Sequence, residues 1–273
     1  MGNNPFGSLI DFIFDFYIFL FYIRMFTTTR ERYDTLLGMV YRATDPVLRY
    51  AGSTFRFNQF NFAPLLVVAL LLILKGLIFP IGIAGTFQNF FSFLFQAYAL
   101  TLIIIMSYRE YFVNPIVNFA QRLVNPIRAL AANFSNSLLA VNVTSLIIVI
   151  LLHSLVIFIF ILNGWIGVED HSPAKYALLK SLWLILNLTT FFIIVIIANA
   201  LLTWFSPDPM NPLVQLLSLL SAPIVDPFRR FIPPLAGMLD LSPMAAIFAL
   251  WFAWQVGASI LALIFGSRLL AIM

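Results

Sequence analysis

The sequence contains no cysteine, and only 10% of its 273 residues are charged. The lack of cysteine excludes disulfide bonds, thiolate chemistry and metal sites with cysteine ligands. Soluble domains carry roughly a quarter charged residues, so this chain has too few to form a hydrated surface. It is instead strongly apolar: 62% of its residues are hydrophobic, thirty are phenylalanine, and the mean hydropathy is +0.99. These values predict an integral membrane protein.

Six segments reach the roughly 20 apolar residues that a helix needs to cross a bilayer. Each is continuous and lacks the two-residue alternation of a barrel strand, so the sequence predicts an all-α transmembrane fold. The six predicted membrane-spanning helices are residues 8–27, 60–79, 90–108, 143–164, 182–205 and 244–267.

The connections after the first, third and fifth spans are long and contain prolines. Together with Arg24 at the end of the first span, they hold eleven of the fifteen basic residues. Loops rich in Lys and Arg stay on the cytoplasmic side of a membrane. The sequence therefore predicts that these three connections are cytoplasmic and that both termini lie outside.

Each long connection starts with a polar helix-capping residue twelve positions before a proline. An apolar stripe with helical spacing lies between them, which predicts a short amphipathic helix that the proline ends. The capping residues are Asp34, Asn114 and Asn211, and the prolines are Pro46, Pro126 and Pro223. Pro243 opens the last span after a polar residue, as Pro64 opens the second span.

This recurrence predicts three tandem repeats of span, amphipathic helix and span, at residues 1–84, 85–170 and 171–273. Such repeats all point the same way across the membrane, unlike the inverted repeats of many secondary transporters. Each amphipathic helix is expected at the cytoplasmic interface or against the inner side of the bundle.

Ionisable residues inside the predicted spans are few. Asp11 and Asp15 share a face of the first span because they are four residues apart, and Lys75 falls at a similar depth in the second span. Charges in a membrane are costly unless they are paired, so we expect an Asp15–Lys75 ion pair assisted by Asp11. Three interpretations stay open: a structural clamp, a cation or proton site, and aspartates that reach out to the outer membrane interface.

The third long connection carries the other candidate site, at Asp226, Arg229, Arg230, Asp240 and Ser242. Juxtamembrane arginines bind anionic lipid headgroups. Anchoring of the topology and docking of a protein partner are the alternatives. Among polar residues within the spans, we expect His153, Asn187 and Asn199 to make hydrogen bonds between helices. No Walker, Rossmann, HExxH or Ser–His–Asp arrangement is present, so we expect no enzyme, no cofactor and no metal site.

The third repeat resembles the YggT family, known as YlmG in Gram-positive bacteria and plastids. The resemblance rests on Asn211-Pro212, Pro223, the segment from Asp226 to Arg230, Pro233-Pro234 and the segment from Asp240 to Pro243. The first repeat resembles the family more loosely, through Asp45-Pro46 and Pro64. This resemblance implies a multi-pass protein of the bacterial inner membrane with no established enzymatic activity. It also implies links to osmotic and potassium homeostasis, to division and envelope functions and, in plastids, to cytochrome assembly.

We therefore expect a non-catalytic membrane accessory or scaffold protein that bears on osmotic or ion homeostasis and on envelope organisation. One alternative is a small transporter or channel for ions or osmolytes. Another is an assembly factor for a larger respiratory or division complex. The expected partners are membrane lipids and either other integral membrane proteins or a second copy of this chain, and no nucleic acid.

Overall fold

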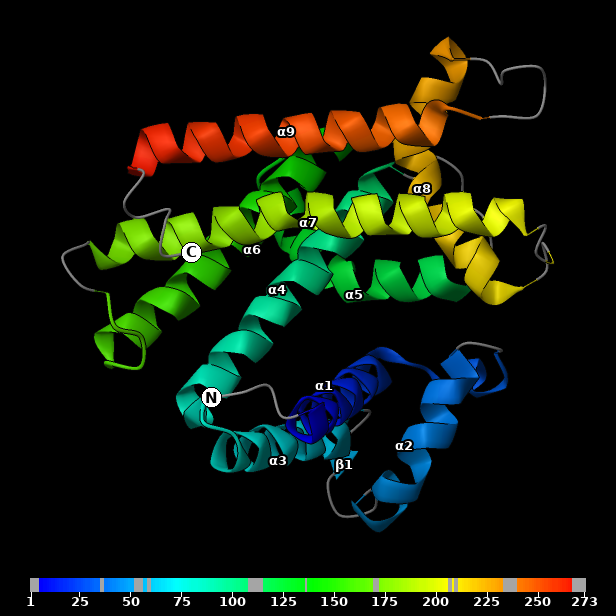
Figure 1. The fold of residues 1–273 in the computed structure, drawn as a ribbon. Helices are drawn as coiled ribbons and strands as arrows, with labels where there is room; N and C mark the ends of the chain where they lie inside the picture. The colour runs from blue at the N-terminus through cyan, green and yellow to red at the C-terminus, as the bar shows by residue number, and fades with distance from the viewer. Residues whose placement is uncertain are drawn as a thin grey trace. The chain divides into compact units, whose positions relative to one another are not determined.

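The computed structural model describes residues 5–34, 37–51, 56–57, 60–107, 115–135, 137–168, 172–205, 208, 211–232 and 240–266. These residues form helices joined by short connections, together with one short strand pair (Figure 1). The long helices are α1 (Pro5–Phe26), α4 (Gly82–Ser107), α6 (Leu138–Leu162), α7 (Pro173–Trp204) and α9 (Ser242–Phe265). The others are η1 (Thr29–Tyr33), α2 (Leu37–Ala51), α3 (Ala63–Ile78), α5 (Pro115–Ala132) and α8 (Pro212–Phe231).

Five helices are long and apolar enough to cross a membrane: α1, α4, α6, α7 and α9. The predicted span at residues 60–79 is shorter than expected, because α3 has 16 residues. At 1.5 Å per residue, α3 is roughly 24 Å long, less than the roughly 30 Å hydrocarbon core. The predicted span began at residue 60, but Phe60–Asn61 forms a short strand (β2) instead of helix. This strand pairs antiparallel with Arg56–Phe57 (β1).

Two spans start eight or nine residues earlier than predicted. α4 begins at Gly82 rather than near residue 90, and α7 begins at Pro173 rather than near residue 182. The polar residues that marked the predicted boundaries bond within their own helices: Thr86 Oγ1 donates to the Gly82 carbonyl at 2.9 Å, and Ser181 Oγ to the Ala177 carbonyl at 3.0 Å. Gly82 has φ +72°, a left-handed conformation that glycine adopts without strain, and it makes the α3–α4 turn tight.

The prediction that a proline ends each amphipathic helix is wrong. Pro46, Pro126 and Pro223 lie inside α2, α5 and α8, which continue for at least five residues beyond them. A proline removes one helical hydrogen bond but does not prevent a helix that is held by packing on both sides. Each helix has an apolar residue just past its proline packed in a cluster: Leu48, Ile127 and Val225.

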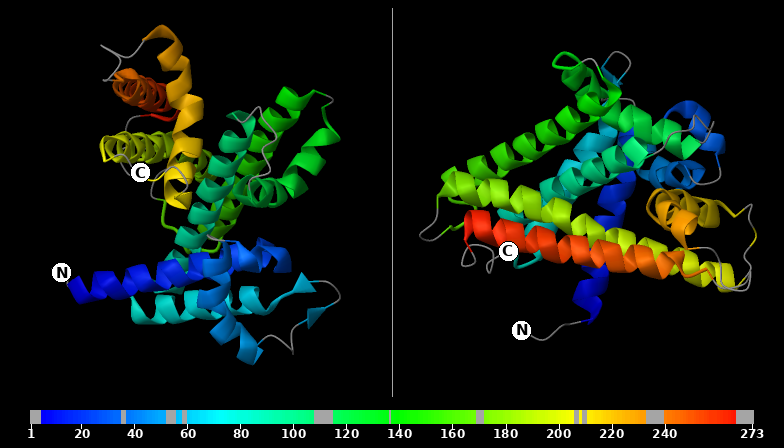
Figure 2. Two further views of the ribbon diagram at one scale, coloured as in Figure 1. Left: turned by 90° about the vertical axis from the view of Figure 1, so that its right-hand side faces the viewer. Right: turned by 90° about the horizontal axis from the view of Figure 1, so that it is seen from above.

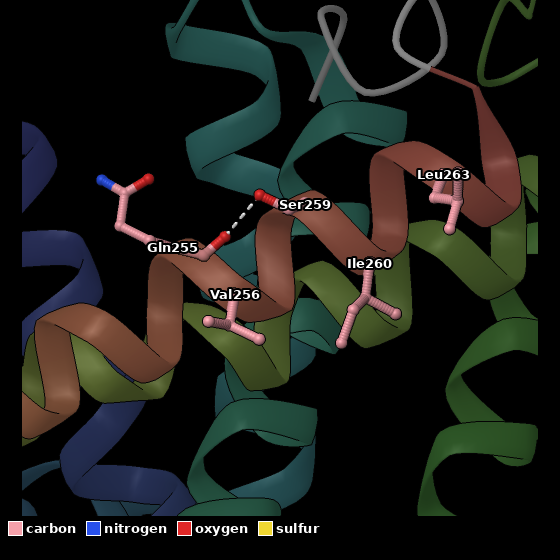
Figure 3. Close-up of a pocket in the computed structure, with 5 residues that line it drawn as sticks. All are labelled: Gln255, Val256, Ser259, Ile260 and Leu263. Carbon is pink, nitrogen blue, oxygen red and sulfur yellow. Dashed lines mark hydrogen bonds between the residues drawn. The ribbon is translucent and has the colours of Figure 1, made fainter.

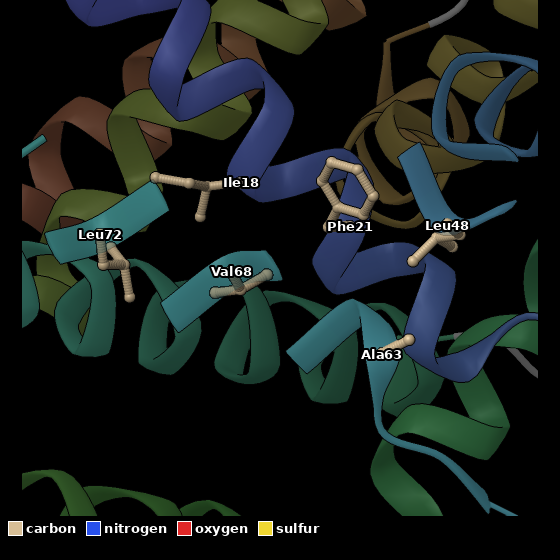
Figure 4. Packing of buried hydrophobic residues seen from close by; sticks show 6 residues of the cluster. All are labelled: Ile18, Phe21, Leu48, Ala63, Val68 and Leu72. Carbon is tan, nitrogen blue, oxygen red and sulfur yellow. The ribbon is translucent and has the colours of Figure 1, made fainter. Parts of the chain in front are cut away.

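The chain divides into two compact units, one of Met1–Phe91 with Val113–Leu123 and the other of Ser92–Phe112 with Val124–Met273. In the first unit, α1 packs against α3, and α2 packs against both. Ile18 and Phe21 of α1, Leu48 of α2, and Ala63, Val68 and Leu72 of α3 form its apolar cluster (Figure 4). Phe21 is 1% exposed and Ala63 is fully buried.

The second unit holds two further clusters. In the first, Val124 of α5 packs with Phe95 and Leu102 of α4 and Val149 of α6. In the second, Val225 of α8 packs with Ile196 of α7 and Ala246 of α9. Within this unit α9 runs alongside α7, and α8 packs against both (Figure 2). Each of the three clusters thus joins one amphipathic helix to the helices that precede and follow it.

The turn between α3 and α4 yields a prediction about two glycines. A Cβ on Gly76 would lie 2.5 Å from the Cα of Ile83, so Gly76→Ala must move the backbone of α4. A Cβ on Gly257 would meet only the Leu186 side chain, at 2.6 Å, which can rotate away. We expect Gly76→Ala to destabilise the protein by about 1–3 kcal/mol, and Gly257→Ala by less than about 1 kcal/mol because alanine also favours the helix.

Thermal unfolding of the full-length protein in detergent measures both changes. Equal melting temperatures for the two variants would contradict the close approach of α3 and α4.

Candidate functional site

Lys75 in the last turns of α3 faces two carboxylates of α1. Its Nζ lies 2.6 Å from Asp15 Oδ1 and 2.9 Å from Asp11 Oδ1. The helices bring these side chains together because α1 and α3 pack side by side and the two aspartates are one helical turn apart. The structure therefore places together the three residues that the sequence singled out for an ion pair.

The exposure of the three side chains differs. The Lys75 side chain is 9% exposed, whereas those of Asp11 and Asp15 are 44% and 60% exposed. Asp11 and Asp15 are six and ten residues into α1, or roughly 9 and 15 Å from its start. The ammonium group is thus enclosed between the helices, and two carboxylates supply its counter-charge from the α1 side. Chemically, this arrangement can hold α1 to α3.

The second candidate site joins the end of α8 to the start of α9. Arg229 Nη1 donates to Asp226 Oδ1 at 3.0 Å, and Arg229 Nε donates to Asp240 Oδ2 at 2.9 Å. Asp240 Oδ1 in turn accepts the backbone N–H of Ser242 at 2.9 Å, and Ser242 is fully buried. These bonds fix where α9 begins relative to α8. Arg229 therefore has two carboxylate partners within the protein.

Arg230 has a different environment from its neighbour. It is exposed, and it makes no ion pair with any residue among those that the structure describes. Of the two arginines that the sequence proposed for lipid headgroups, Arg230 is the one whose guanidinium is open to a ligand. The structure thus separates the two: Arg229 joins two helices, and Arg230 remains available at the surface.

Asp240 lies just outside the last span and has a perturbed pKa. Burial alone would raise the pKa of this carboxyl group, but hydrogen bonds from Ser242 and the hydrogen bond and charge of Arg229 outweigh burial and leave the pKa below its ordinary value. The carboxylate form is therefore stabilised in the folded protein.

The first unit contains a polar network that sequence reasoning did not find. Asp45 of α2 accepts from Arg24 at 3.4 Å and from Arg32 at 2.8 Å. The Arg24 guanidinium also lies 3.6 Å from the centre of the Tyr41 ring. Glu31 is bound by Arg122, and its other oxygen accepts the Thr28 N–H at 2.8 Å. From the sequence these arginines indicated only topology, because no local spacing links Arg24 to Asp45 or Glu31 to Arg122.

Asp34 and Asn211 stand where helix caps were predicted. Asp34 Oδ1 accepts the Leu37 N–H at 3.0 Å at the start of α2. Pro212 is the first residue of α8, directly after Asn211. Asn114, Pro233 and Pro234 lie outside the described residues.

His153 of α6 is 5% exposed and lies in a small polar cluster between three helices. Its Nδ1 lies 2.7 Å from Ser181 Oγ of α7, its Nε2 lies 3.5 Å from Ser92 Oγ of α4, and its ring stacks on Phe95. Ser154 Oγ also lies 2.9 Å from Ser181 Oγ. The expectation that His153 is a hydrogen-bonded packing residue is confirmed.

Two asparagines of α7 join that helix to its neighbours. Asn199 Nδ2 donates to Ser221 of α8 at 2.9 Å, and Asn199 Oδ1 accepts from Ser218 at 3.2 Å. Asn187 Oδ1 accepts from Trp254 Nε1 of α9 at 3.5 Å. The prediction that both asparagines hydrogen-bond between helices is confirmed.

The Lys75 contacts predict a non-additive effect on stability. Lys75→Met should lower the free energy of unfolding by about 1–3 kcal/mol, because it leaves two carboxylates at an apolar interface. We expect less than the 3–5 kcal/mol typical of fully buried pairs, since both aspartates are half exposed. Adding Asp11→Asn and Asp15→Asn should restore most of the loss. The control is Lys175→Met, an exposed lysine near the start of α7. Unfolding in detergent measures all three proteins, and an unchanged Lys75→Met variant would contradict the clamp.

The lowered pKa of Asp240 predicts a pH dependence with a definite sign. A carboxyl group whose pKa is lower in the folded state stabilises the protein above its unfolded pKa of about 3.9, and this stabilisation is lost as the pH falls through the folded pKa. Asp240→Asn should therefore cost about 1–2 kcal/mol near pH 7, and this cost should shrink as the pH falls below about 3.9. The control is Asp226→Asn, which removes a half-exposed ion pair and should cost less at pH 7. A pH-independent cost of Asp240→Asn would contradict this reading.

Comparison with known proteins relates these features to a family. The family model described as CCB3/YggT matches residues 178–261, which lie in α7, α8 and α9 together with their connections. The uncharacterised protein PA0392 of Pseudomonas aeruginosa is 32% identical over 165 residues, covering 58% of this chain and 79% of that protein. No solved structure matches this chain significantly. The similarity extends over most of the relative's length, and the family model matches the part of the chain that carries the sequence resemblance. The chain belongs to the CCB3/YggT family.

Proposed function

We propose that this protein is a non-catalytic scaffold or accessory protein of the bacterial inner membrane. The observation that carries the proposal is that several polar side chains within its spans bind one another across helices. Lys75 binds Asp11 and Asp15 between α1 and α3, and His153 and the two asparagines of α7 bind neighbouring helices. Such bonds hold a bundle in one arrangement, which is what a scaffold requires.

The proposed organisation is three copies of one unit, and the apolar clusters support it. In the first and third copies, the residue directly before the span-opening proline is fully buried: Ala63 before Pro64, and Ser242 before Pro243. The helix α2 binds α1 and α3 as α8 binds α7 and α9. One amphipathic helix per copy thus sits between two longer apolar helices.

We further propose that α2, α5 and α8 lie at the cytoplasmic face, with both termini outside. The polar faces of α2 and α8 carry exposed arginines, Arg42, Arg49 and Arg230, and basic residues are retained on the cytoplasmic side. Each basic residue close to an anionic leaflet contributes roughly 1 kcal/mol of attraction. Arg230 is the arginine of the third copy that we assign to lipid headgroups.

Scaffolding predicts no ion conduction by the protein alone. Purified full-length protein in liposomes with a potassium gradient should give no flux above protein-free liposomes, whereas a known potassium ionophore gives rapid flux in the same vesicles. In cells, deletion of the gene should impair growth after osmotic upshift, and both the wild-type protein and the Lys175→Met control should restore it.

Two results would favour the alternatives. A protein-dependent flux that Lys75→Met abolishes would replace the scaffold with a channel or transporter. Normal osmotic growth of the deletion strain, with stable co-purification of a respiratory or division complex, would favour an assembly factor.

A further inference from the structure

The last span carries an uncovered polar side chain in the middle of its outer face. On one side α9 packs against α7 and α8, where Ala246 is fully buried and Gly257 approaches Leu186. On the other side an exposed stripe with helical spacing runs along the helix, and it includes Phe248, Trp251, Gln255, Ser259 and Leu263. This stripe is apolar apart from Gln255 and Ser259, and we call it the α9 outer face.

Gln255 lies close to the middle of α9, thirteen residues after Ser242 and ten before Phe265. Its backbone carbonyl accepts from Ser259 Oγ at 2.8 Å, but its side-chain amide has no hydrogen-bond partner within the described part of the chain (Figure 3). An amide in hydrocarbon without a hydrogen bond is strongly unfavourable, because no water is there to replace the partner. The middle of a span is thus a costly position for an exposed glutamine.

The surface beside this amide has room for another helix. A shallow groove of about 320 Å³ runs along α9, lined by Gln255, Val256, Ser259, Ile260 and Leu263 (Figure 3). Small residues such as serine let helix backbones approach closely within a membrane. Trp251 and Phe248, both at least half exposed, add large apolar area to the same face.

We propose that a second copy of this chain covers the α9 outer face, with the two α9 helices packed in parallel about a two-fold axis along the membrane normal. Two copies inserted with one topology place equivalent residues at equal depth, so Gln255 meets Gln255 of the second copy. A primary amide is both donor and acceptor, so two of them form reciprocal hydrogen bonds across a two-fold axis. A different protein would need its own polar group at this depth. The proposal stands apart from the scaffold function.

The lack of cysteine in the natural chain allows a direct test. Ser259→Cys, one helical turn from Gln255 on the same face, leaves the amide intact. Oxidised in native membranes, this full-length variant should give a covalent dimer of twice the 30.9 kDa chain mass. The control is Ile194→Cys in α7, a residue that is 61% exposed and lies outside the proposed interface. It should stay monomeric. No dimer from Ser259→Cys, equal dimer from both variants, or a cross-linked product of another mass would overturn the proposal.

A second measurement tests the role of the amide. Energy transfer between labelled copies in liposomes, over a range of protein-to-lipid ratios, reports self-association. Gln255→Leu should weaken it roughly three- to tenfold, whereas Gln255→Asn, which keeps an amide, should stay close to the wild type. Leucine suits a lipid-facing site, so the variant should fold, and unchanged thermal unfolding checks this. Undiminished association of the Gln255→Leu protein would overturn the amide contact.

Discussion

The structure depends on one constraint: amphipathic helices have an apolar face that must be covered, and here the flanking helices of the chain cover it. Each of α2, α5 and α8 places one apolar cluster between the two helices that flank it in the chain. This packing is strong enough to carry a helix through a proline, because residues on both sides of Pro46 and Pro223 are held in place. A lost hydrogen bond costs less than uncovering the cluster.

Ion pairs between neighbouring helices reinforce this packing within each unit. Near the helix ends, Arg229 joins α8 to the start of α9 through Asp226 and Asp240, and Arg24 joins α1 to Asp45 of α2. Between α1 and α3, Lys75 has two carboxylate partners. The residues differ between the two units, yet each set ties one amphipathic helix or span to its neighbour.

Local sequence predicted much of the fold. The length of the apolar segments predicted the five long helices, and the Asn211-Pro212 pair predicted where α8 begins. Helical spacing placed Asp11 and Asp15 on one face of α1. Boundaries were less certain, because polar residues such as Thr86 can bond to their own helix and continue it. The effect of proline could not be predicted, since it depends on whether residues beyond it are packed. The span at residues 60–79 was overestimated because a strand pair takes its first two residues.

The sequence by itself determined that this chain belongs in a membrane, since composition and run length alone decide whether a segment prefers hydrocarbon to water. It also determined which residue types could pair within the spans, because so few are ionisable. Only the tertiary structure decided which partners they take. Arg122 meets Glu31, and Arg229 rather than Arg230 binds Asp240. Such choices depend on how helices distant in sequence pack, and local spacing carries no information about that.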